Sequence, residues 1–151
     1  MRFLDSTELE KILKFPVRPD GQVSGSLITM TLCDVHQIMG EAELGPDDAG
    51  TKEARRIKRP SRRSTGEEIG WWDLGQGAYW ITYNERVEIP PDCVLVIQPH
   101  KRILSNGVWH PAVLIRDWDK EMEGMLLTVS SRGIRASENT VISCGFVLQV
   151  D

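Results

Sequence analysis

The sequence predicts a mainly β protein with one short helix near its amino terminus. From residue 69 onward, short apolar and β-branched segments recur about every ten residues with turn residues between them, which is typical of a sandwich or barrel. Only residues 5–14 carry a clear helical pattern. The 151 residues, 40% of them hydrophobic, fit a single domain over 1–151 with enough apolar material for a core.

The overall charge and the cysteine content exclude several classes of protein. A net charge of −4 gives no general attraction to nucleic acid or to anionic membranes, so neither is an expected partner. No apolar run approaches the roughly 18 residues of a membrane span, and acidic residues stand where a signal peptide has its apolar region. Cys33, Cys93 and Cys144 are far apart and odd in number, which argues against disulfides and a zinc site. We therefore expect a cytoplasmic protein with plain buried thiols.

The helix predicted over residues 5–14 has recognisable signals at both ends. Asp5 is a capping residue, and Glu8 stands three positions later, where it completes a capping box. The apolar residues within the helix form one face, so the helix is expected to pack on the rest of the domain. Pro16 ends the helix and favours an extended conformation at Phe15.

Two contrasting segments follow the helix. Residues 26–39 are rich in apolar and β-branched residues, and residues 27–34 are mostly apolar on both sides of a strand, so a well-buried strand is expected there, with His36 beyond it as a surface or capped histidine. Residues 41–66 are acidic in their first half and basic in their second, with almost no apolar residues, which indicates a mobile charged loop. The alternative is a contact with phosphate or nucleic acid, although no aromatic residue interleaves the basic part for base stacking. The cations are Lys52, Arg55, Arg56, Lys58, Arg59, Arg62 and Arg63.

The remainder of the chain reads as strands separated by turns. The stretch 70–124 holds all five Trp and both Tyr, so we expect it to supply the core and the site. Residues 117–124 are expected to form a hairpin or loop. Strands are expected at 78–83, 86–89, 93–97, 112–115, 125–129, 134–136 and 141–150.

Several motifs in this stretch resemble those of the dUTPase and dCTP deaminase superfamily. Residues 77–92, GAYWITYNERVEIPPD, are similar to its strand, Asn/Thr-Glu, strand and Pro-Asp turn, and the Gly-Trp-Trp at 70–72 resembles its archaeal dUTPase-related branch. The family then has Pro-Arg-Ser-Ser-Leu-Leu-Arg-x-Gly, where residues 99–107 read PHKRILSNG. Its next motif is Trp-Asp-Pro-Gly-Tyr-Glu-Gly, where residues 118–124 read WDKEMEG.

This resemblance, which covers about residues 26–150, implies both a fold and an activity. It implies a distorted β-barrel or jelly roll, assembled as a homotrimer with sites between subunits, that hydrolyses dUTP to dUMP and pyrophosphate with Mg²⁺. In dUTPases an Asp activates water for attack on the α-phosphate, the Arg-Ser-Ser turn binds phosphates and the Tyr packs on the deoxyribose. Such chemistry needs positive charge on the phosphates and one positioned acceptor for the water proton.

Residue by residue, the motifs are only partly kept. Asp119 matches the catalytic Asp, whereas Met122 replaces the sugar-stacking Tyr. Two of the three Arg-Ser-Ser positions hold cations, but the hydroxyls are lost. The resemblance thus implies Asp119 as the catalytic residue and no protein metal ligand. The implied substrate-binding residues are His100, Lys101, Arg102, Gly107, Met122 and Gly124.

Two functions from different classes remain open. One is a divergent dUTPase-like hydrolase, and the other is a catalytically inactive protein that keeps the fold for ligand binding or protein interaction. Val129 replaces the catalytic Glu of the deaminases and cannot shuttle protons, so cytosine deamination is not expected. Asp119 has a structural interpretation as a turn residue. The flanking Asp117, Glu121 and Glu123 are either Mg²⁺ ligands or a solvated acidic tip.

Overall fold

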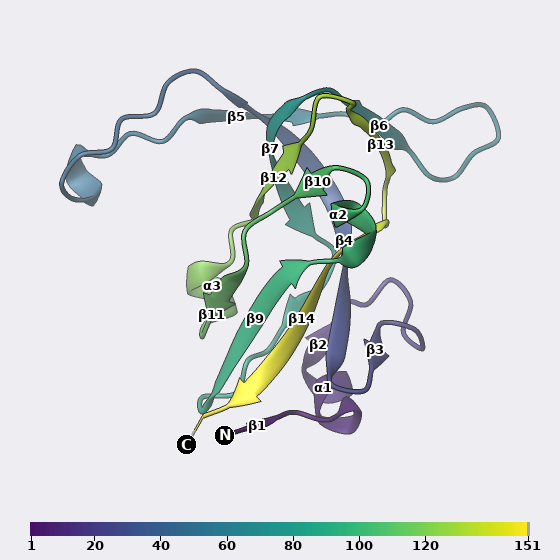
Figure 1. Cartoon of the computed structure of the whole chain (residues 1–151), viewed down its shortest axis with the longest axis vertical. Helices are drawn as coiled ribbons and strands as arrows, with labels where there is room; N and C mark the ends of the chain where they lie inside the picture. The colour runs from purple at the N-terminus through teal and green to yellow at the C-terminus, as the bar shows by residue number, and fades with distance from the viewer. Residues whose placement is uncertain (151) are drawn as a thin grey trace.

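The computed structural model describes residues 1–150, which form a curled antiparallel sheet with a few short helices (Figure 1). Strands predominate, so the predicted mainly β class is confirmed. In chain order the elements are β1 (Arg2–Phe3), α1 (Ser6–Ile12), β2 (Leu13–Lys14), β3 (Val23–Ser24), β4 (Leu27–Met39), η1 (Asp48–Gly50), β5 (Arg55–Arg59), β6 (Trp71–Leu74), β7 (Gly77–Tyr83), β8 (Arg86–Val87), β9 (Cys93–Pro99), α2 (Lys101–Leu104), β10 (Val108–Trp109), β11 (Val113–Ile115), α3 (Trp118–Glu121), β12 (Met125–Val129), β13 (Ile134–Ser137) and β14 (Val141–Gln149).

Strand β4 organises the main sheet, whose order is β10-β12-β7-β4-β14-β9-β11. Its first half pairs with β14 and β3, and its second half pairs with β7 and β5. The register against β7 shifts between Leu32 and Val35, and the register of β14 against β4 shifts between Val141 and Ser143. Such irregularities bend strands, and here they let the sheet curl over its own core.

The core inside this curl draws on the whole chain. The stretch 70–124 contributes Trp72 and Tyr79, but the prediction that it supplies the core is only partly right, because Trp109 is 51% exposed and β4 and β14 contribute as well. Side chains alternate between the two faces of β4, so every second one faces the core inside the curl. The fully buried apolar side chains on β4 are Ile28, Met30, Leu32 and Val35.

A buried carboxylate fixes the turn between β7 and β8. Glu85 is 2% exposed and accepts hydrogen bonds from Thr31 N at 2.7 Å, from Thr31 Oγ1 at 2.5 Å and from Gln22 Nε2 at 2.9 Å. Beside it, Asn84 Nδ2 donates to Asn139 Oδ1 at 2.9 Å. The Asn-Glu pair that resembles the family motif therefore ties this turn to β4 and to the start of β14.

A second chain of buried hydrogen bonds joins β7, β14 and the segment after β10. The Tyr83 hydroxyl lies 2.6 Å from Ser143 Oγ, which lies 2.7 Å from His110 Nε2. His110 Nδ1 is 2.8 Å from the carbonyl oxygen of Pro111, which can only accept, so Nδ1 carries the proton and Nε2 accepts from Ser143. Burial lowers the pKa of His110 and raises the pKa of Tyr83. Every polar side-chain atom in this series of hydrogen bonds has a partner when His110 and Tyr83 are both neutral.

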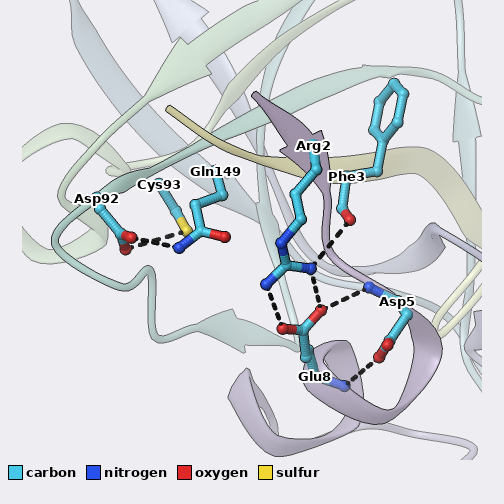
Figure 2. A network of polar contacts seen from close by, with 7 residues as sticks. All are labelled: Arg2, Phe3, Asp5, Glu8, Asp92, Cys93 and Gln149. Atoms are coloured by element: carbon cyan, nitrogen blue, oxygen red, sulfur yellow. Dashed lines mark hydrogen bonds and ion pairs between the residues drawn. The ribbon is translucent and has the colours of Figure 1, made fainter. Parts of the chain in front are cut away.

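The amino-terminal helix begins as the sequence predicts (Figure 2). Asp5 accepts from the N–H of Glu8 and donates its own N–H to Glu8 Oε2, which is the predicted capping box. Arg2 donates to both oxygens of Glu8 and lowers the pKa of that carboxyl to about 2. The expectation for Phe15 is wrong, because its φ is +57°. After pairing with β8, the chain turns away at Phe15, just before Pro16.

Residues 41–66 do not form a loop throughout. Strand β5 pairs with the end of β4, and Glu43 forms an isolated bridge with Lys52, so an ordered hairpin projects from the sheet with η1 at its tip (Figure 1). Backbone pairing with β4 explains why a segment poor in apolar residues is a strand. The mobility of the segment stays a prediction. His36 lies within β4 and not beyond it.

Two further expectations concern the burial of the thiols and the length of the helices. Cys93 is buried, whereas Cys33 and Cys144 are half-buried, so the expectation of buried thiols is right only for Cys93. Across residues 1–150, no helix is long and apolar enough to cross a membrane.

Candidate functional site

The predicted catalytic residue lies in α3, a helical turn where the sequence predicts a hairpin or loop. Asp117 caps this turn by accepting from the N–H of Asp119 at 3.1 Å. The Asp119 side chain is 66% exposed, and Arg86 binds both of its oxygens: Nη1 contacts Oδ1, and Nη2 lies 2.8 Å from Oδ2. This bidentate pair lowers the pKa of Asp119 and raises that of Arg86. The carboxylate is therefore ionised and oriented, but it already has a partner.

The predicted phosphate-binding residues lie at and within α2, which the sequence does not predict. His100 caps this turn, since its Nδ1 accepts from the N–H of Arg102 at 3.0 Å. Burial lowers the pKa of His100, and the charges of Arg102 and Lys101 act in the same direction. His100 is therefore a neutral capping residue, whereas the side chains of Lys101 and Arg102 are exposed.

One chain does not bring Asp119 together with these cations. Asp119 lines a hollow that it shares with Arg86, Arg116 and Pro91, whereas Arg102 lines a different cavity. Figure 1 likewise places α3 and α2 in different parts of the molecule. A site that contains both the carboxylate and the cations of α2 therefore needs a second copy of the chain.

The other predicted binding residues have structural reasons for their identity. Met122 is half-buried and packs against the core. A Cβ atom on Gly124 would lie 2.4 Å from Nε1 of Trp80, so only glycine allows the indole to pack there. Gly107 has a φ of +76°, which favours glycine in the turn after α2.

The carboxylates around Asp119 do not form a metal site. Glu121 accepts from the N–H groups of Arg116 and Asp117, and Asp117 caps α3, so these groups serve the backbone of the turn. No group of three His, Cys, Asp or Glu side chains suited to a metal ion exists among the described residues. The acidic side chains of this turn are therefore not grouped as a Mg²⁺ ligand set, and a role for Mg²⁺ stays a prediction.

Most of the cations in residues 52–63, a segment that includes β5, contact other residues of the chain. The Arg56 guanidinium lies 3.8 Å above the ring of Trp80, and Lys58 forms an ion pair with Asp34 at 3.2 Å. Trp80 is thus covered and does not offer a stacking platform. Within residues 1–150, three of these cations have side chains without a hydrogen bond, an ion pair or a contact with an aromatic ring: Lys52, Arg55 and Arg62.

Arg86 is the residue of this candidate site that the sequence did not reveal. It stands 33 residues before Asp119, on a two-residue strand, and no spacing rule connects the two positions. Its only sequence signal is its place directly after the Asn-Glu pair that resembles the family motif.

No family model matches the chain, but its sequence is similar to those of curated proteins. Over 150 residues it is 24% identical to a probable deoxyuridine 5'-triphosphate nucleotidohydrolase of Methanosarcina mazei and 25% identical to that of Methanosarcina barkeri. Each match covers 94% of this chain and 85% of the relative.

A solved structure is similar in fold. The 2'-deoxycytidine 5'-triphosphate deaminase of Agrobacterium tumefaciens superposes with a TM-score of 0.63 at 14% sequence identity. The match covers 96% of this chain, which spans about half (48%) of the deaminase chain. The sequence similarity and the shared fold together confirm that this chain resembles the dUTPase and dCTP deaminase superfamily.

Proposed function

We propose that this chain is a dUTPase-related protein of deoxynucleotide metabolism that hydrolyses dUTP to dUMP and pyrophosphate. The observation that carries the proposal is the exposed, ionised Asp119 at the position of the dUTPase water-activating carboxylate. Similarity to probable dUTPases over 94% of the chain supports it. Deamination is not proposed, since Val129, at the position of the deaminase Glu, is a buried core residue.

In this reaction Asp119 orients a water molecule and accepts its proton. The water oxygen forms a bond to the α-phosphorus while the bond from that phosphorus to the bridging oxygen breaks, and pyrophosphate leaves. Because its pKa is low, Asp119 acts mainly by positioning the water. Lys101 and Arg102 of a second copy would supply positive charge to the phosphates. The carboxylates near Asp119 do not fit a protein-bound Mg²⁺, so any Mg²⁺ requirement belongs to the triphosphate.

The proposal includes an oligomer, because the carboxylate and the cations lie apart in one chain, and the family resemblance implies that it is a homotrimer. An apolar outer face of the β1-β14-β9-β11 layer supports assembly. Phe3 and Leu114 are 53% and 61% exposed there, and the pairing register places Leu148, Val96 and Phe146 on the same face. Apolar surface of this kind marks an interaction site.

The test is pyrophosphate release from a panel of deoxynucleoside triphosphates with Mg²⁺, beside the variant Asp119→Asn. We expect turnover of dUTP by the wild type and a loss of at least about a hundredfold in the variant, the range typical of a removed acid–base group. Glu123→Gln, an exposed neighbour on the same turn, is the matched control and should keep its activity.

The second candidate function is a noncatalytic protein of the same fold. The specific observation in its favour is that Arg86 already holds Asp119, while His100 is committed to capping α2. A folded oligomer that releases no pyrophosphate from any nucleotide would establish this alternative.

A further inference from the structure

A cavity of about 310 Å³ lies between α2 and the small β6–β13 sheet, and we propose that it binds a planar aromatic anion such as an aromatic carboxylate. The cavity is lined by both elements and by the starts of β14 and β10. Its apolar floor is formed by Ile103, Val108, Leu127, Ile134 and Ile142, and its rim carries Trp71, Arg102, Arg135, Asn106, Ser137 and Thr140.

The size and floor of the cavity determine the shape of the ligand. An apolar cavity of about 150 Å³ holds benzene, so about twice that volume accommodates a bicyclic ring. Four of the floor residues belong to the buried core and make a rigid apolar surface: Ile103, Val108, Leu127 and Ile142. Specific small-molecule sites have this composition, with an apolar floor and a few polar groups at the rim.

The rim determines the charge of the ligand. Arg135 already has partners, since its guanidinium lies 4.4 Å from the ring centroid of Trp71 and its Nε is 3.8 Å from Asp73. The Arg102 guanidinium, in contrast, has no acceptor among the described residues, although it lines a cavity with an apolar floor. An arginine fork of this kind pairs with a carboxylate in a bidentate way.

Two hydroxyls complete the site. Ser137 and Thr140 flank the same cavity and are half-buried, and within residues 1–150 their side chains have no hydrogen-bond partner. They can bond the carboxylate or a polar ring substituent. The cavity shares Arg102 with the proposed phosphate-binding residues, but ligand binding here does not require the proposed hydrolysis, because neither Asp119 nor Lys101 lines this cavity.

The experiment titrates the full chain with 2-naphthoate and, in parallel, with its neutral amide, 2-naphthamide, and follows assigned methyl NMR signals. We expect saturable binding of the acid, with the shifts confined to Ile103, Leu127, Ile134 and Ile142. Arg102→Gln should weaken binding of the acid by about tenfold or more, as expected for one lost charge-assisted hydrogen bond. It should leave the affinity for the amide unchanged.

Two further variants separate the cavity from the general surface. Ala136→Phe fills the cavity and should abolish binding of both compounds. Arg132→Gln removes a neighbouring arginine that lines a different hollow and should change neither affinity. The proposal is overturned if acid and amide bind equally well to the wild type, if Ala136→Phe keeps the wild-type affinity, or if the shifts lie outside the cavity.

Discussion

Among single residues, Glu85 tolerates substitution least, because its buried carboxylate accepts from three neutral donors and has no cation beside it. Glu85→Gln would turn an –NH₂ group toward donors that need an acceptor. We expect a loss of about 1–3 kcal/mol in the free energy of unfolding, the cost of leaving buried polar groups unpaired. Urea denaturation measures this. The control is Glu88→Gln, which removes an exposed ion pair with Lys14 at 3.8 Å that contributes little to stability. Equal effects of both substitutions would contradict the assigned role.

The neutral state of His110 makes stability depend on pH. Because burial lowers its pKa in the folded state, the unfolded chain binds more protons between that value and about 6.5, so stability rises with pH across this window. The contribution is complete above about pH 6.5 and declines as the pH falls toward the folded value. We expect His110→Gln to flatten the dependence of Tm on pH between about pH 5 and 7.5. His100→Asn, which keeps a capping side chain, tests the smaller contribution of His100. An unchanged slope in His110→Gln would refute this account.

Among the elements, the loop over residues 61–70 is held by backbone bonds between Arg62 and Trp71 and by one carboxylate that follows β13. Glu138 accepts from Gly70 N at 2.6 Å, from Ser61 Oγ at 3.0 Å and from Arg63 Nη2 at 3.1 Å. These bonds lower the pKa of Glu138, so its contribution is complete above the ordinary carboxyl value and is lost as the pH falls through the lowered one.

We expect Glu138→Gln to loosen this loop without unfolding the sheet. Trypsin should then cleave after Arg62 or Arg63 several times faster, since cleavage follows local opening, while Tm changes little. Glu67→Gln, an exposed residue in the same loop, is the control. Faster cleavage elsewhere, or an equal rate in both variants, would show that Glu138 does not hold the loop.

For the molecule as a whole, local signals were readable from the sequence and long-range pairings were not. The capping box of Asp5 needs only neighbours in the chain, and the strand at 125–129 follows from its own composition. Strand β5 contains almost nothing that predicts a strand, since it exists by pairing with β4. The Arg86–Asp119 pair depends in the same way on how β8 and α3 meet in space. The family resemblance supplied the topology that composition alone left open between sandwich and barrel.

A subunit-mixing experiment tests whether the site is shared between two chains. If Asp119 of one chain works with Lys101 and Arg102 of another, Asp119→Asn and the double variant Lys101→Ala/Arg102→Ala are each inactive alone. In randomly mixed oligomers made from equal amounts, each of the two contributing chains has an even chance of being the right variant, so about a quarter of the sites are intact. Pyrophosphate release should therefore recover to about a quarter of the wild-type value, with mixing verified by native mass spectrometry. Mixed oligomers that stay inactive would show that the carboxylate of one chain does not work with the cations of another, which would overturn the shared site.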